Sequence, residues 1–343
     1  MWVMLNPSKV LIIRLSSLGD VVLSTPVLAA LKAAWPTAHL TFLTKGAFAP
    51  VLKRHPLIDE IIVFEERGWW GWVGEIRRQK FDVLIDLHGT VRSRAWSLLS
   101  GASCRVRYDK RAAERRRLVW TKKDSPRLAG NVVDRYLEPL EALGVSAIDR
   151  VPKLFVGPEE RLPDVLEKRL GPGPFLGIAP GALHATKQWP GDRFAAAADR
   201  LAAGRPVALF GTRGDARAAE SVLKTLTSPA QSFVGQTSVR EMMMMLRRCD
   251  LLLSNDSGAT HVAAALGVPT LAVFGPTVKP FGFFPVGART AVVEVAGLEC
   301  RPCSIHGSKK CPLGHFRCMK DVTVDQVVAS AQALLRNESK SSL

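Results

Sequence analysis

The stretch Ser254-Asn-Asp-Ser-Gly-Ala-Thr-His261, directly after the apolar run Leu251-Leu-Leu253, decides how the second half of the chain folds. Its counterpart in the first half is Arg14-Leu-Ser-Ser-Leu-Gly-Asp20, directly after Val10-Leu-Ile-Ile13. Each pattern predicts a buried strand that ends in a polar, glycine-containing turn, after which a helix begins. Because open α/β sheets place ligands outside the carboxyl ends of their strands, the two turns predict two α/β domains that face one cleft.

Alternating strands and helices are predicted along the rest of the chain, which favours parallel sheets with right-handed crossovers. In the first half, we expect strands at residues 10–15, 40–43, 60–64 and 82–87, and helices at residues 21–34, 47–54, 72–79 and 93–99. The alternative for the first of these helices is a start at Pro26, since proline suits the first helical position. In the second half, we expect strands at residues 175–179, 207–211, 232–234, 251–254 and 270–274, and helices at residues 193–203, 216–226, 239–247, 260–266 and 324–335. The expected domains are an N-terminal domain at 1–160, a linker at 161–174, a C-terminal domain at 175–322, and a helix with a disordered tail at 323–343.

The composition is that of a globular protein: 343 residues, of which 47% are hydrophobic and 7% aromatic, enough for two domains of ordinary size. No apolar run reaches the ~18–20 residues that cross a membrane. The first five residues are too short for the apolar core of a signal peptide and lack a basic flank. We therefore expect a cytoplasmic protein.

Positive charge is concentrated between Arg92 and Arg127, where 12 lysines and arginines stand against three acidic residues. Such a surface attracts polyanions, such as nucleic acid, an anionic membrane face or an acidic glycolipid. The alternative is a solvated basic helix without a partner, although like charges at this density repel one another when no anion is bound. The segment contains Tyr108 and Trp120 but no motif that reads RNA, so a peripheral membrane contact is favoured over nucleic acid.

The turn after the first predicted strand offers a single carboxylate, Asp20. At a strand end it can act as a general base if it reaches the proton that it takes. The alternative is that Asp20 only caps the helix that follows. Ser16 and Ser17 can contact an anion at the same turn, and Gly19 permits close approach of the backbone.

The second half offers groups that suit a phosphate. Gly181 and Ala182 follow a predicted strand, and Lys187 just beyond them either neutralises phosphate as a point charge or is an ordinary surface lysine. Asp215 ends another strand and resembles the acid that binds a ribose hydroxyl in dinucleotide folds.

The start of the helix after residue 254 is the second phosphate-binding candidate. Asp256, Ser257 and Gly258 open it, and free N–H groups at a helix start suit a diphosphate. His261 either donates to phosphate or packs against the strand. The first strand is not followed by Gly-x-Gly-x-x-Gly, and the chain has no P-loop, so dehydrogenase and P-loop functions lose support.

Four of the six cysteines lie close together near the C-terminus, at Cys300, Cys303, Cys311 and Cys318. Because disulfides are rare in the cytosol, the group is a candidate for a tetrahedral structural zinc site. The alternative is a set of reduced, partly buried thiols. Cys104 and Cys249 are expected to be solitary.

In combination, these segments resemble bacterial glycosyltransferase family 9, the ADP-heptose:lipopolysaccharide heptosyltransferases. The resemblance is carried by Arg14-Leu-Ser-Ser-Leu-Gly-Asp-Val-Val22, Thr25-Pro26, Pro180-Gly-Ala182, Lys187-Gln-Trp-Pro190, the stretch from Ser254 to Gly267, and Val273-Phe-Gly-Pro-Thr277. The segment from Cys311 to Met319 is most similar to heptosyltransferase II. The chain departs from the family pattern at Val278-Lys-Pro-Phe-Gly-Phe-Phe-Pro285, which leaves that edge of the donor pocket undefined.

The resemblance implies a GT-B architecture, with two Rossmann-like domains and the active site between them. It implies inverting transfer of heptose from ADP-L-glycero-D-manno-heptose to the lipid A–Kdo inner core, at the cytoplasmic face of the inner membrane and without a catalytic metal or other cofactor. Asp20 matches the catalytic base and Lys187 the phosphate-side lysine. The implied donor-binding residues are Ser16, Ser17, Gly19, Gly181, Ala182, Asp215, Asp256, Ser257, Gly258 and His261. The implied acceptor-binding residues are Arg92, Arg94, Arg105 and Arg107, and neutralising Arg111, Arg115, Arg116 and Arg117 is expected to weaken acceptor or membrane binding.

Two other interpretations stay open at this point. One is a different GT-B enzyme that acts on another nucleotide sugar, such as an epimerase, for which a preference for UDP-sugars would be the sign. The other is a non-catalytic polyanion-binding protein, whose function would survive loss of the Asp20 carboxylate.

Overall fold

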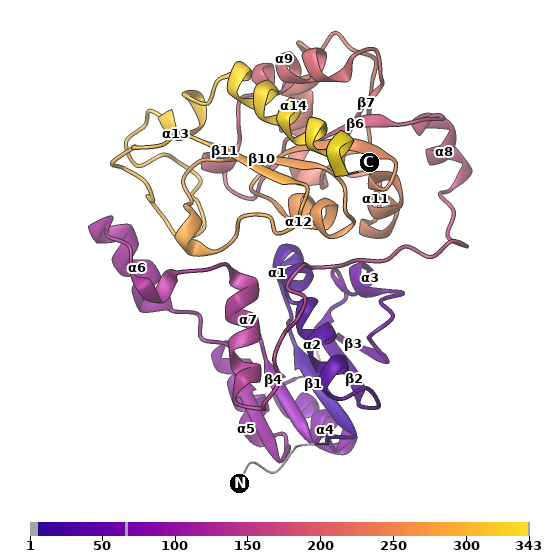
Figure 1. Cartoon of the computed structure of the whole chain (residues 1–343), viewed down its shortest axis with the longest axis vertical. Coiled ribbons are helices and arrows are strands. Elements are labelled where there is room, and N and C mark those ends of the chain that lie inside the picture. Colours follow the sequence, from indigo (N-terminus) through magenta and orange to yellow (C-terminus); the bar gives the residue numbers. More distant parts are fainter. Residues whose placement is uncertain (1–5, 66–67, 342–343) are drawn as a thin grey trace. The chain divides into compact units, whose positions relative to one another are not determined.

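The computed structural model describes residues 6–65 and 68–341, with side chains up to residue 336. The chain divides into two compact units (Figure 1). The N-terminal unit comprises Met1–Arg111 and Gly130–Phe155, and the C-terminal unit comprises Ala112–Ala129 and Val156–Leu343. No helix in the described part of the chain is both long enough and apolar enough to cross a membrane.

The N-terminal unit contains a five-stranded parallel sheet in the order β3-β2-β1-β4-β5. Its strands are β1 (Lys9–Ile13), β2 (His39–Lys45), β3 (Glu60–Phe64), β4 (Val83–Asp86) and β5 (Cys104–Arg107). Its helices are α1 (Leu18–Leu23), α2 (Pro26–Ala34), α3 (Ala49–Leu52), α4 (Trp69–Gln79), α5 (Val91–Leu99) and α7 (Val132–Glu141). The central strand β1 is fully buried after its first residue, as expected for a parallel strand that is covered on both faces.

Helices cover both faces of this sheet (Figure 1). Leu11 and Ile13 point to the face covered by α4 and α5, where Trp72 and Trp96 meet with ring centroids 6.0 Å apart. Because side chains alternate along a strand, Val10 points to the opposite face, where α2 packs beside α7. This packing holds the carboxyl ends of β1 and β4 in fixed positions beside each other.

The C-terminal unit contains a six-stranded parallel sheet in the order β11-β10-β9-β6-β7-β8. Its strands are β6 (Phe175–Ala179), β7 (Val207–Leu209), β8 (Ala230–Ser232), β9 (Cys249–Asn255), β10 (Thr270–Phe274) and β11 (Thr290–Glu294). Its helices are α6 (Ala112–Thr121), α8 (Asp164–Leu170), α9 (Gly191–Ala202), α10 (Ala216–Leu223), α11 (Val239–Leu246), α12 (Gly258–Ala265), α13 (Arg317–Lys320) and α14 (Val324–Ser341). Short 3₁₀ turns lie at η1 (Pro126–Leu128), η2 (Ala185–Lys187), η3 (Arg213–Asp215) and η4 (Lys279–Phe281).

Two helices differ from the sequence expectation. The helix expected at 21–34 is divided into α1 and α2, and α2 begins at Pro26 as the alternative interpretation had it. The division arises because the hydroxyl groups of Ser24 and Thr25 bond back to the carbonyls of Val21 and Val22. At the other end, the tail expected to be disordered from residue 337 is helical to Ser341 in α14. Residues of α14 before that tail belong to the core of the C-terminal unit.

The domain ranges also differ from the expected ones, because α6 and η1 belong to the C-terminal unit although the chain on either side belongs to the N-terminal unit. Leu118 and Leu128 form a small apolar cluster with Phe281. Arg115 is only 6% exposed, and its guanidinium lies 5.4 Å from the ring centroid of Phe283. The helix is polar on nearly all sides, so these few contacts decide which unit it joins.

Candidate active site

Asp20 lies just beyond the carboxyl end of β1, in the first turn of α1. Its Oδ2 accepts the backbone N–H of Ser17 at 3.0 Å and the Ser17 hydroxyl at 2.7 Å. This is the helix-capping role that the sequence left open. The other oxygen, Oδ1, accepts the Tyr136 hydroxyl at 2.7 Å and lies 2.6 Å from a guanidinium nitrogen of Arg14. The carboxylate therefore does more than cap α1.

Arg14 controls the charge state of this carboxylate. Its guanidinium is buried, donates to the Leu87 carbonyl at 2.5 Å, and lies 5.2 Å from the ring centroid of Tyr136. Burial alone raises the pKa of Asp20, but the charge of Arg14 and the hydrogen bonds from Tyr136 and Ser17 together hold that pKa well below its usual range. Asp20 is consequently ionised at neutral pH, and it can only accept hydrogen bonds.

The neighbouring β4 turn brings a histidine to the same end of the sheet. The fully buried Asp86 accepts the backbone N–H groups of His88 and Gly89 at 2.9 and 2.8 Å and the Ser93 hydroxyl at 2.9 Å. Burial, followed by the positive charge of Arg14, lowers the pKa of His88 to about 4. His88 is therefore neutral at physiological pH and supplies a polar, uncharged imidazole to this edge.

The sequence did not single out Tyr136, and it gave Arg14 no role. Tyr136 lies on α7, 116 residues after Asp20, and nothing in its own neighbourhood points to that contact. The chain has only two tyrosines, and Tyr108 packs against Tyr136 with ring centroids 4.8 Å apart. The scarcity of tyrosine was therefore the only signal that the sequence offered.

The four predicted acceptor-binding arginines lie on two adjacent elements of the N-terminal unit. Arg92 and Arg94 are exposed on α5, and Arg105 and Arg107 are exposed on β5. In the described part of the chain, the side chains that contact Asp20 are those of Arg14, Ser17 and Tyr136 rather than these arginines.

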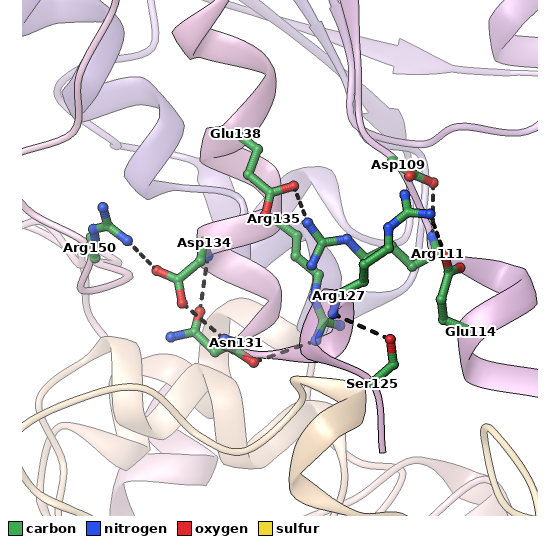
Figure 2. Close-up of polar contacts among 11 residues, drawn as sticks. Asp109, Arg111, Glu114, Ser125, Arg127, Asn131, Asp134, Arg135, Glu138 and Arg150 are labelled. Carbon is green, nitrogen blue, oxygen red and sulfur yellow. Dashed lines mark hydrogen bonds and ion pairs between the residues drawn. The ribbon is translucent and has the colours of Figure 1, made fainter. Parts of the chain in front are cut away.

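Two other members of the basic segment are engaged within the protein. Arg111 donates to both carboxylate oxygens of Glu138, at 2.6 and 2.7 Å (Figure 2). Arg127 pairs with Glu114 at 2.5 Å in the C-terminal unit. Neutralising Arg111 or Arg115 would also remove contacts within the protein, because Arg111 is the ion-pair partner of Glu138 and Arg115 packs on Phe283. The expected effect on acceptor or membrane binding stays a prediction.

Lys187 and Asp256 form the centre of the second site. The Lys187 ammonium lies 2.6 Å from Asp256 Oδ2, and the two side chains are only 14% and 8% exposed. Thr277 donates to the same oxygen at 2.8 Å. Lys187 is therefore not an ordinary surface lysine. Its ammonium is a half-buried cation that is neutralised by the Asp256 carboxylate.

Asn255 fixes the loops that carry this pair. Its side-chain oxygen accepts the backbone N–H of Trp189 at 3.0 Å, and its amide donates to the Pro180 carbonyl at 2.7 Å. One residue at the end of β9 therefore joins the loop after β6 to the turn that carries Lys187.

The start of α12 lies next to Asp256. Ser257 is the N-cap residue, but its side chain makes no capping hydrogen bond, and its buried hydroxyl has no hydrogen-bond partner. Gly258 is the first helical residue, and His261 is buried on the next turn. Unused backbone N–H groups, the helix dipole and a free hydroxyl together form a site that favours an anion.

Asp215 lies against the loop after β6. Its Oδ2 accepts the backbone N–H and the hydroxyl of Thr212, both at 2.8 Å. A methyl group added to Gly181 would come within 2.1 Å of the Asp215 carboxylate, so only glycine fits at that position. The predicted pair of Gly181 and Asp215 is thus adjacent in space, with one Asp215 oxygen used by the turn itself.

All four clustered cysteines line one cavity of about 490 Å³, together with side chains of α6 such as Trp120. Burial raises the pKa of the Cys311 thiol, but the backbone N–H groups of residues 313 to 316 hold that pKa below its ordinary value. Within the described residues, however, no three His, Cys, Asp or Glu side chains are arranged to hold a metal ion. The thiols share a cavity without converging, so the zinc site stays a prediction.

Metal analysis tests the zinc prediction directly. We expect about one equivalent of zinc per chain in protein purified without chelators, because thiolate side chains can rotate toward a cation within their shared cavity. Cys303→Ser should remove the metal, whereas Cys104→Ser in the N-terminal unit should not. Less than half an equivalent of zinc in the unsubstituted protein would refute the prediction.

Comparison with known proteins was made against family profiles, curated sequences and solved structures. The profile described as glycosyltransferase family 9 (heptosyltransferase) matches residues 70–315. Lipooligosaccharide heptosyltransferase 2 of Haemophilus influenzae is 28% identical over 351 residues, which cover 95% of this chain and 99% of that protein. Lipooligosaccharide heptosyltransferase 2 of Campylobacter jejuni is 32% identical over 168 residues, or about half of each chain (47% and 51%).

The structure of ADP-heptose LPS heptosyltransferase II from E. coli superposes with a TM-score of 0.74 at 23% identity, covering 96% of this chain and 99% of that one. Both folds consist of parallel sheets flanked by helices, which confirms the expected GT-B class for the present chain.

Proposed function

Because this chain belongs to glycosyltransferase family 9, the heptosyltransferases, we propose that it transfers heptose from ADP-L-glycero-D-manno-heptose to the lipopolysaccharide inner core. It is a glycosyltransferase, and the named relatives act in lipopolysaccharide or lipooligosaccharide synthesis. The observation that carries the proposed chemistry is the ionised Asp20 carboxylate at the carboxyl end of β1, with Arg14 and Tyr136 fixed against one of its oxygens.

In this proposal, Asp20 is the general base. The acceptor hydroxyl oxygen attacks the anomeric carbon of heptose from the face opposite ADP, its proton passes to Asp20, and the bond from carbon to the β-phosphate oxygen breaks with inversion. A carboxylate with so low a pKa is a weak base. We infer that it takes the proton late, when the forming C–O bond has made the hydroxyl strongly acidic.

The donor diphosphate is assigned to the start of α12. Lys187 would neutralise charge that builds on ADP as it leaves, while Ser257 and the backbone from Gly258 onward would donate to phosphate oxygens. The Lys187 ammonium already pairs with the Asp256 carboxylate at 2.6 Å. In this proposal, donor binding replaces that carboxylate with the diphosphate as the anionic partner of Lys187. Asp215 keeps its role as a ribose-binding candidate.

The other donor candidates, Ser16, Ser17, Gly19, Ala182 and His261, also stay proposals. For the acceptor, we propose the exposed Arg92, Arg94, Arg105 and Arg107, since the inner core carries Kdo carboxylates and lipid A phosphates. Because this acceptor is a membrane lipid, we also propose that the enzyme acts as a peripheral protein at the cytoplasmic face of the inner membrane.

A transfer assay with acceptors that carry zero, one or two heptoses tests the proposed function. We expect ADP-heptose to be used with the one-heptose acceptor, because the full-length similarity is to heptosyltransferase 2. Faster turnover of a UDP-sugar would show a different GT-B enzyme. Binding of the acceptor without turnover of any nucleotide sugar would show a polyanion-binding protein.

A further inference from the structure

Helix α6 presents two opposite faces with different chemistry. Arg115 and Leu118 are buried against the C-terminal unit. By the 3.6-residue period, Arg116, Arg117 and Trp120 lie together on the other face, and all three are exposed. The inner face therefore anchors the helix and leaves the outer face available.

The side chains on the outer face of α6 make few contacts with the rest of the described chain. Trp120 borders the cavity of the clustered cysteines and is nevertheless 80% exposed, so its large apolar ring and its N–H are available to a partner. Within the described residues, the guanidinium groups of Arg116 and Arg117 have no hydrogen bond or ion pair. Lys123 follows directly after the helix and is exposed as well. One aromatic ring flanked by cations is thus presented to solvent.

We propose that this face of α6, defined by Arg116, Arg117, Trp120 and Lys123, docks the enzyme on an anionic membrane surface. Tryptophan is favoured at the boundary between headgroups and acyl chains because its ring is apolar and its N–H is polar. Lysine and arginine gain free energy from anionic lipid headgroups within a Debye length of the surface. A single aromatic ring among cations fits this boundary better than it fits nucleic acid, which requires a series of stacking rings.

The attachment of α6 suits a docking element. The Lys122 ammonium donates to the Pro302 carbonyl at 2.7 Å, and Leu118 is fixed in the apolar cluster with Phe281. These contacts attach α6 firmly to the C-terminal unit, so a surface that binds the outer face of the helix also holds this unit. The proposal depends on the proposed function in one respect, which is that this function identifies the membrane. Docking itself can be measured without any sugar substrate.

Vesicle co-sedimentation of the full chain tests the proposal. Vesicles of phosphatidylethanolamine with phosphatidylglycerol should bind the protein, vesicles of phosphatidylcholine alone should not, and binding should weaken as salt is raised. Arg116→Gln with Arg117→Gln should weaken binding by about 25-fold, at roughly fivefold per arginine. Trp120→Ala should weaken it by at least about fivefold and remove the salt-resistant fraction.

Matched controls come from α4. Arg77→Gln with Arg78→Gln removes two exposed arginines, and Trp70→Ala removes a tryptophan that is 74% exposed. Both controls should bind like the unsubstituted protein, and every variant should keep its thermal midpoint. Trp120→Ala and the two controls should also keep their turnover of a water-soluble, delipidated acceptor.

Three results would overturn the docking surface. The first is equal loss of vesicle binding in the α4 and α6 variants. The second is unchanged vesicle binding in the α6 variants. The third is loss of binding to a generic RNA by the α6 variants while vesicle binding stays intact. If a soluble acceptor is never turned over but the α6 variants lose vesicle binding, the proposed function fails and the docking surface stands.

Discussion

Replacing Asp20 by asparagine should lower heptose transfer by about 10²–10⁴-fold, the contribution of a positioned general base. Asparagine has the same shape and can still accept from Ser17, but it cannot take the proton. Affinity for ADP should change little, because Lys187 and Asp256 lie in the other unit. Steady-state transfer and calorimetric titration with ADP measure the two effects.

The same substitution should also destabilise the N-terminal unit. Asp20 is the ion-pair partner of the buried Arg14, and leaving a buried charge without its partner costs about 3–5 kcal/mol. The native pKa of Asp20 lies below its unfolded value of ~4, so its contribution is present above that pH and is lost as the pH falls further. Asp20→Asn should therefore unfold at lower temperature at neutral pH and lose less stability on acidification.

Asp59→Asn is the matched control, since it removes the Lys32 partner at a more exposed position in the same unit. It should leave transfer unchanged. If Asp20→Asn retains more than about a tenth of the wild-type rate at a temperature where it is folded, Asp20 is not the base.

Replacing Lys187 by methionine should weaken ADP-heptose binding by about 30- to 100-fold, equivalent to ~2–3 kcal/mol for lost hydrogen bonds to a charged group. The loss has two parts. The lysine no longer neutralises the diphosphate, and the Asp256 carboxylate, 8% exposed, is left to repel it. Isothermal titration with ADP measures the sum.

A double substitution separates these two parts. Lys187→Met with Asp256→Asn should bind ADP more tightly than Lys187→Met alone, because the unpaired buried carboxylate is gone. Lys224→Met, at an exposed position of the same unit, should have no effect. Equal affinities for the single and double variants would mean that Asp256 does not face the bound diphosphate.

The sequence predicted the buried strands better than the edges. The bounds of the buried strands β6 and β10 agree with the predicted ranges, because continuous apolar runs bordered by polar turns have few alternatives. Those of the edge strand β3 agree as well. The edge strands β5 and β11 were not predicted, since Cys-Arg-Val-Arg in β5 alternates with charge and has no buried residue, and Val293 is the single buried residue of β11. Helix α7 was also missed and contains a proline at position 139.

Within the site, the sequence predicted those residues that lie in the segment after a predicted strand. Asp256 follows β9 directly, and Asp20 and Lys187 lie in the segments that follow β1 and β6, so their place at the carboxyl ends of the strands follows from the pattern. Contacts between residues that are far apart in the sequence could not be predicted from it. Tyr136 reaches Asp20 from a helix that was not predicted, and Thr277 reaches Asp256 from the loop after β10.

The membership of α6 in the C-terminal unit has a topological consequence. The chain passes from one unit to the other three times, near residues 111, 129 and 155, so the C-terminal unit is discontinuous in sequence. A fragment that begins at Val156 lacks Leu118 and Leu128 and uncovers Phe281. A single cut in the chain therefore cannot separate the two units of this transferase. A circular permutation or fusion that preserves the fold has to include α6 together with the rest of the C-terminal unit.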